Sequence, residues 1–125
     1  MIETLEFIRE QMEILEIPYE FMAWSSDVKY PYFVAEISEI EPTTEDGLEE
    51  KKIIITGFTR DNWMELIEVQ EKIKKAFPSI GGKTAVLDDG SGIAVFYDTA
   101  LPIPTGEAEL KKIEIYLTIK LWKVE

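Results

Sequence analysis

The side chains that could do chemistry in this 125-residue chain are carboxylates, hydroxyls and lysines, because it contains no histidine and no cysteine. Without cysteine there are no disulfides, zinc–thiolate sites or cysteine nucleophiles. Without histidine the commonest general base and the commonest metal ligand are also missing. Chemistry therefore has to come from carboxylate groups or from a Ser–Lys pair.

Two acidic segments invite a metal-binding interpretation. Residues 88–92 (DDGSG) place two carboxylates beside a serine, but they do not have the alternating acids and terminal glutamate of an EF-hand loop. Their glycines and aspartates are typical of a tight turn between two strands. Residues 45–50 also gather acids that could hold a cation weakly, and we interpret them as a solvated or partner-facing loop.

The candidate catalytic patterns have little specificity. Ser26 and Lys29 have the S-x-x-K spacing of a Ser–Lys nucleophile, a spacing that is common by chance. Residues 81–84 (GGKT) lack the upstream glycine and the strand-to-helix setting of a phosphate-binding loop. Paired carboxylates suit glycosidases, but acids occur almost everywhere in this chain. We therefore predict no catalytic residue, no cofactor and no metal site.

The charge of the chain is unevenly distributed. The net charge is −12, and residues 1–50 carry 14 acids against Arg9 and Lys29, whereas acids and bases cancel in the remainder. This balance excludes a basic nucleic-acid footprint. The acidic N-terminus does not resemble a signal peptide. Stretches without charge span only about eight residues, so we expect a soluble protein with no membrane contact.

The first elements that must position these side chains are a helix and three strands. Leu5, Ile8, Met12 and Leu15 recur at helical spacing within residues 4–15, and Phe7 and Ile14 widen this apolar face. The opposite face consists of glutamates: Glu3, Glu6, Glu10, Glu13 and Glu16. Pro18 ends the helix. Strands are expected at residues 18–24, 32–41 and 51–59, and the last two are expected to pair as a hairpin.

A second helix and three further strands complete the pattern. The helix is expected to begin at Asn62 with a capping box to Glu65 and to bury Trp63. Residues 83–87 and 93–97 predict a hairpin, and residues 101–109 an irregular excursion. Residues 113–121 alternate as a long half-buried strand, with a slip of phase at Leu121 and Trp122.

These elements predict an α+β fold with a single domain over residues 1–125. The expected order is α-β-β-β-α-β-β-β, with a mainly antiparallel sheet packed by two helices.

Three segments together resemble a known family. They are residues 32–36 (YFVAE), the strand–loop–strand formed by residues 40–47 (IEPTTEDG) and 53–60 (IIITGFTR), and the helix that begins at Asn62 and Trp63. With a helix before them and a long strand after them, they resemble the tail terminator proteins of long-tailed bacteriophages and prophages, also called tail-completion or tail-to-head joining proteins.

The resemblance implies a structural protein of the phage tail, made in the bacterial host cytoplasm and assembled into the virion. Such subunits form a ring, usually a hexamer, that ends tube polymerisation. The implied partners are other copies of the chain, the tail-tube protein and a head-completion or connector protein. DNA passes through such a ring without being specifically bound. By this analogy the expected interface residues are Glu41, Glu45, Asp46, Glu49, Glu50, Lys111 and Lys112.

The charge pattern fits this implication in two ways. An acidic wall would repel passing DNA. Unlike patches, one acidic and one basic, would suit the heterologous contacts of a ring. The sequence leaves open two alternatives: a non-catalytic acidic module that binds or inhibits a basic partner, and a carboxylate-based enzyme. The glutamate face of the first helix motivates the first of these alternatives.

Overall fold

The computed structural model describes residues 2–22, 30–40, 48–107 and 109–122. Two helices and six strands follow one another in the expected order, α-β-β-β-α-β-β-β. The helices are α1 (Ile2–Ile14) and α2 (Trp63–Ala76). The strands are β1 (Tyr19–Phe21), β2 (Tyr32–Ile40), β3 (Leu48–Thr59), β4 (Lys83–Val86), β5 (Gly92–Pro104) and β6 (Lys111–Trp122).

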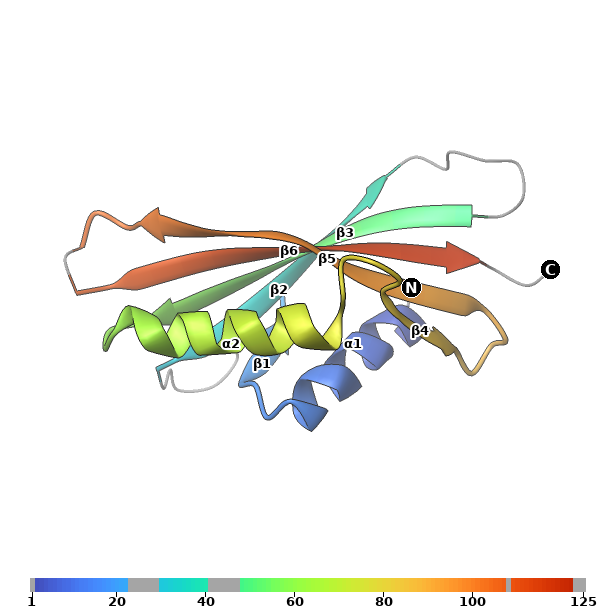
Figure 1. Cartoon of the computed structure of the whole chain (residues 1–125), viewed down its shortest axis with the longest axis horizontal. Helices are drawn as coiled ribbons and strands as arrows, with labels where there is room; N and C mark the ends of the chain where they lie inside the picture. Colours follow the sequence, from blue (N-terminus) through green and yellow to red (C-terminus); the bar gives the residue numbers. More distant parts are fainter. Residues whose placement is uncertain (1, 23–29, 41–47, 108, 123–125) are drawn as a thin grey trace.

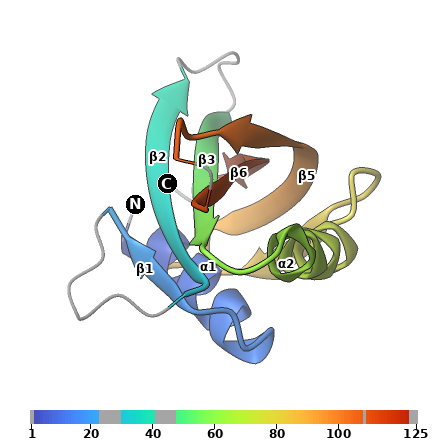
Figure 2. The ribbon, with the colours of Figure 1, turned by 90° about the vertical axis from the view of Figure 1, so that its left-hand side faces the viewer.

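All six strands form one curled sheet in the order β1-β2-β3-β6-β5-β4 (Figure 2). Strands β2 and β3 pair antiparallel, as do β4 and β5, so both predicted hairpins are confirmed. The sheet is mixed, because β1 runs parallel to β2. The sheet is mainly antiparallel, as expected, since the other four strand pairs are antiparallel.

Both helices pack on the same face of the sheet (Figure 1). The predicted alternation of the last strand is confirmed, since every second residue from Ile113 to Leu121 is buried. Its neighbour β3 buries Ile53 and Ile55 in the same layer. Apolar side chains of both helices cover this layer: Phe7, Ile8 and Met12 from α1, and Leu66, Val69 and Ile73 from α2. The opposite face of β2, β3 and β6 remains partly exposed.

Gly57 allows a close approach within this core. A Cβ atom built on Gly57 would lie 2.2 Å from Cε2 of Phe33, its cross-strand partner on β2. The Phe33 ring is fully buried, so it has no free space into which to move. The backbone of β3 therefore has to be glycine where this ring lies against it.

Helix α1 differs from the expectation in the residues that it buries and in the residue at which it ends. In α1 the buried residues are Thr4, Phe7, Ile8 and Met12, and Ile14 is 72% exposed. Ile14 lies on the same side of the helix as Phe7, seven residues away, but it is the last helical residue and its side chain remains in solvent. The helix ends at Ile14, followed by Glu16 with φ 59°, whose left-handed conformation reverses the chain ahead of Pro18.

The predicted capping box of α2 does not form. Asn62 occupies the N-cap position without a side-chain cap hydrogen bond. Glu65 instead accepts a hydrogen bond from the Thr59 hydroxyl at 3.1 Å, so its carboxylate joins the helix to the end of β3. The prediction that Trp63 is buried was also wrong, because its side chain lies at the solvent-facing start of the helix and is 38% exposed.

The largest difference concerns β5. The expected excursion at residues 101–109 is replaced by a strand that continues to Pro104 and pairs with β6. Strand β4 covers only Gly92–Val95 of β5, so the prolines lie where β5 is an edge strand, which tolerates them. The predicted slip at Leu121 and Trp122 is absent. The register shift lies instead in β5, between Tyr97 and Thr99.

Residues 88–92 form the predicted turn between β4 and β5. The Gly90 amide donates to the Leu87 carbonyl oxygen at 2.9 Å, and Gly90 has φ 89°. The Ser91 amide donates to Oδ1 of Asp89 at 2.9 Å. Hydrogen bonds from the backbone amide and the side chain of Ser91 hold the pKa of the Asp89 carboxyl below its ordinary value.

Candidate functional site: two ends of the sheet and one edge groove

The expected interface residues lie at opposite ends of the same pair of strands. Glu49 and Glu50 are near the start of β3, whereas Lys111 and Lys112 are at the start of β6. Because these strands are antiparallel, Glu50 pairs with Lys120 and Lys112 pairs with Phe58. The separation of eight residue steps along each strand corresponds to about 27 Å. The other three expected residues, Glu41, Glu45 and Asp46, lie outside the described residues.

Charges near the acidic end are partly bound within the chain. Lys51 is 3% exposed, and its Nζ lies 3.3 Å from Oε2 of Glu49. A buried ammonium group requires such a partner, so Glu49 has a structural role besides any role at a surface. Glu50 points to the opposite, partly exposed face of the sheet, since side chains alternate along β3.

Neighbouring lysines are also engaged in contacts within the chain. Lys52 binds Asp98 across the sheet at 2.6 Å, where the Thr118 hydroxyl also donates to Asp98. The register shift beside Asp98 turns this carboxylate toward the open face of the sheet. Lys51 and Lys52 therefore contribute less free positive charge than the sequence suggests.

At the other end of the strands, aromatic rings and cations alternate. Tyr32 and Phe58 pair across β2 and β3 and stack with their centroids 5.1 Å apart. The ring centroids of Tyr30 and Tyr32 lie 5.5 Å apart, and the Arg60 guanidinium lies 5.6 Å from the Tyr30 ring centroid. Arg60 also donates to the Tyr30 hydroxyl at 3.2 Å. We call Tyr30, Tyr32, Phe58, Arg60, Lys111 and Lys112 the aromatic–cationic end.

Two of its cations have acidic neighbours. Arg60 lies 3.5 Å from Glu107, and Lys112 lies 4.0 Å from Glu114 and 6.0 Å from the Phe58 ring centroid. Lys111 donates to the backbone oxygen of Glu109 at 3.4 Å and has no carboxylate partner among the residues that the structure describes. Lys111 is therefore the cation of this end that is most available to an acidic partner.

A shallow trough of about 340 Å³ extends from the aromatic–cationic end along the open face of the sheet. Its floor includes Tyr32, Phe58 and Lys112. Burial, and secondarily the nearby Tyr30, raises the pKa of Tyr32 above its ordinary value, so this phenol stays protonated. Tyrosine and arginine are the residue types enriched at the energetic centres of protein interfaces.

The aromatic–cationic end shows what sequence reasoning missed. Arg60 was not singled out, although it follows Phe58 by two residues, the spacing at which strand side chains share a face. Tyr30 and Tyr32 have the same spacing, but the sequence alone does not give the cross-strand register that stacks Tyr32 on Phe58. Part of the signal was present in the i, i+2 spacing, and the remainder depended on tertiary pairing.

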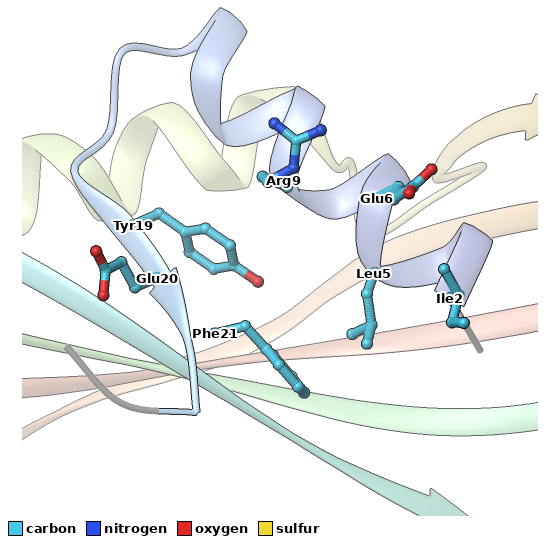
Figure 3. A pocket seen from close by; sticks show the side chains of 7 residues that line it. All are labelled: Ile2, Leu5, Glu6, Arg9, Tyr19, Glu20 and Phe21. Carbon is cyan, nitrogen blue, oxygen red and sulfur yellow. The ribbon is translucent and has the colours of Figure 1, made fainter. Parts of the chain in front are cut away.

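A second concave site lies between α1 and the edge strand β1 (Figure 3). This groove has a volume of about 450 Å³. Its lining residues are Ile2, Leu5, Glu6, Arg9, Tyr19, Glu20 and Phe21. The Tyr19 hydroxyl points into it and has no hydrogen-bond partner among the described residues, and burial raises the pKa of Tyr19 to about 12.

The described part of the chain contains no group of three or more acidic side chains placed to hold a metal ion. The residues of the S-x-x-K pattern, Ser26 and Lys29, lie outside the described residues. Residues 81–84 lead into strand β4 and not into a helix. Within the described ranges, neither helix is long and apolar enough to cross a membrane.

No protein-family model matches the sequence, and no curated protein matches it at a significant level.

Proposed function

We propose that this protein is a structural subunit of a phage or prophage tail that forms a ring at the head-proximal end of the tail tube. The ring ends tube polymerisation and joins tail to head. The observation that carries the proposal is the separation of two unlike surfaces along β3 and β6. Acidic residues lie at one end of these strands and the aromatic–cationic end lies at the other.

This separation suits head-to-tail assembly. A ring of identical subunits needs heterologous contacts, in which one patch of a subunit meets a different patch of its neighbour. Lys111 and Lys112 are too far from Glu49 and Glu50 to pair within one chain. In a ring the acidic end of one copy would instead face the cations of the next, with Tyr32 and Phe58 supplying apolar contact.

The partners follow from this role. The ring consists of copies of this chain, six by the family resemblance, and it binds the tail-tube protein on one side and a head-completion or connector protein on the other. DNA passes through the ring without specific binding, since the net charge of −12 repels phosphate. The site of action is the virion tail, after synthesis in the host cytoplasm.

The test uses the tail-tube protein encoded in the same genome. Tube subunits are polymerised with and without this protein, and tube lengths and ends are measured by negative-stain electron microscopy. We expect shorter tubes with a ring at one end. Tubes of unchanged length with bare ends would refute the proposal. Solution monomers alone would not, because the ring can close on the tube.

A second candidate function is a non-catalytic acidic module that binds or inhibits a basic partner. The exposed face of α1 favours it, since Glu6, Glu10 and Glu13 all lie on solvent-facing positions. Charge reversal distinguishes the two functions. Replacing Glu6 and Glu10 by lysine would abolish inhibition of a basic partner, whereas tube capping through the ends of β3 and β6 would persist.

A further inference from the structure

We propose that Asp98 is a positioning residue for the contact between copies of this chain. Together with the β-bulge in which it lies, it fixes the angle between the acidic end and the aromatic–cationic end, and so the number of copies that close the ring. This inference rests on the proposed ring function and deepens it. A ring of identical subunits closes only if the two contact surfaces of each subunit are held at one angle.

Strand β5 contains one residue more than its pairing with β6 uses. Tyr97 pairs with Leu117 and Thr99 pairs with Tyr116, so Asp98 is the additional residue between two successive pairs. An extra residue in one strand of an antiparallel pair is a β-bulge, which bends the strand and increases its local twist. Figure 2 shows β5 as a strongly curved strand.

The pairs beyond the bulge show that the bend is its main consequence. Without Asp98, Thr99 would follow Tyr97 directly and would keep Tyr116 as its partner. Each later residue of β5 would then keep both its partner on β6 and its face of the sheet, because side chains alternate along a strand. Pairing and burial therefore do not require the extra residue. Its contribution is the bend between residues 92–97 and residues 99–104.

The bulge lies midway between the two unlike surfaces of the sheet. Along β6, Lys112 belongs to the aromatic–cationic end, whereas Lys120 pairs with Glu50 at the acidic end. The bulge is opposite Tyr116 and Leu117, in the middle of this interval. A change in the bend would therefore turn the strand segment that carries Lys112 relative to the segment that carries Glu50.

The Asp98 carboxylate ties three strands together at the bulge. Its Oδ2 accepts a hydrogen bond from the Thr118 hydroxyl on β6 and lies 2.6 Å from Nζ of Lys52 on β3. Lys52 and Thr118 are cross-strand partners, so both reach the carboxylate from the open face of the sheet. The ion pair is partly exposed and contributes little to stability. We therefore assign to these contacts the role of holding the bend at one angle.

The bend is measured as the distance between two spin labels in double electron–electron resonance experiments. The chain contains no cysteine, so Lys83→Cys on β4 and Leu101→Cys on β5 attach one label on each side of the bulge, at exposed positions. Deletion of Asp98 should shift the mean distance by about 3 Å, the rise of one strand residue. Asp98→Ala should broaden the distance distribution, whereas Thr99→Ala, at the adjacent exposed residue, should leave it unchanged.

Two substitutions of Thr118 separate the hydroxyl contact from a general effect on the strand. Thr118→Val removes the hydroxyl and keeps the β-branched shape, and we expect it to broaden the distance distribution as Asp98→Ala does. Thr118→Ser keeps the hydroxyl and should preserve the native distribution. A merely structural role would give the opposite order, because serine fits a strand less well than valine. Circular dichroism verifies that each variant is folded.

The number of copies in each ring is counted in electron micrographs of capped tail tubes. Deletion of Asp98 should give at least tenfold fewer capped tubes, or rings with a different number of copies, whereas Thr99→Ala should give native rings. Native rings from the deletion variant, or an unchanged label distance, would overturn the proposal. If the native protein itself caps no tubes, the proposed function fails instead, and the label distance still decides whether Asp98 sets the bend.

Discussion

At one end of β3 and β6 a lysine lies inside the protein and is paired with a glutamate, whereas at the other end the cations lie on the surface beside aromatic rings. Lys51 is 3% exposed and bound to Glu49. Arg60 is exposed and lies against Tyr30. The comparison teaches that a charge counted in the sequence is not always a charge available to a partner. Glu50 and Lys111 are better candidates for contact between copies than Glu49 and Lys51.

The largest effect on stability is expected for Gly57→Ala, and Gly92→Ala at the other end of the sheet is its control. Gly57→Ala places a methyl group against the buried Phe33 ring, and overpacking of this kind should lower the free energy of unfolding by about 3 kcal/mol. Gly92 is the control at the other end of the sheet, where an added Cβ would lie 3.9 Å from the nearest atom, a Trp122 ring carbon. Gly92→Ala should not destabilise the protein. Urea denaturation measures both, and equal losses would contradict the packing at Gly57.

The next largest effect on stability is expected to distinguish Glu49 from its neighbour Glu50. Glu49→Ala leaves the buried Lys51 ammonium without this partner and should lower the free energy of unfolding by about 2 kcal/mol. Glu50→Ala, on the partly exposed face, should change it by less than about 0.5 kcal/mol. If thermal and urea unfolding show similar losses for both variants, the internal role assigned to Glu49 is wrong.

A pH experiment probes Tyr19 of β1, which pairs in register with the buried Phe33 of β2. Its folded-state pKa is raised from 10.0 to about 12 by burial. The neutral phenol is favoured by folding, so this contribution is fully present below pH 10 and is lost as pH rises through about 12. Across that window the native protein should lose about 1 kcal/mol more stability than Tyr19→Phe. Parallel pH profiles of the two proteins would contradict the burial of this hydroxyl.

The smallest effect on stability is expected for Arg60. Its ion pair with Glu107 is exposed to solvent and should contribute little to folding. Arg60→Ala should therefore unfold at nearly the native temperature in a thermal melt. Its capping of tail tubes should nevertheless be weaker than that of Lys75→Ala, a control on the exposed surface of α2. A large loss of stability would show that Arg60 is structural.

Elements with a strong period were predictable from sequence, and their spatial relations were not. The alternation from Ile113 to Leu121 predicted the buried face of β6, because a period of two fits only a strand. Pro102 and Pro104 suggested an excursion, since sequence does not reveal that this part of β5 is an edge. The parallel pairing of β1 with β2 was likewise not predictable, because it depends on the path of the chain between them.

The candidate site was likewise predictable from the sequence only in part. Composition identified the acidic first part of the chain and the absence of histidine and cysteine chemistry. The burial of Lys51 and the stacking of Tyr32 on Phe58 depend on register, which a single sequence does not encode locally. The groove beside β1 depends on where α1 crosses the edge of the sheet, so no motif could have indicated it.

The most direct test of the head-to-tail contact is charge reversal at both ends of the strands. Glu50→Lys and Lys111→Glu should each reduce ring formation on tail tubes at least tenfold in electron micrographs, because like charges would then face each other in every contact. The double variant Glu50→Lys/Lys111→Glu exchanges the two signs and should restore capped tubes. If the double variant is as defective as the single variants, the acidic end does not meet the aromatic–cationic end of a neighbouring copy.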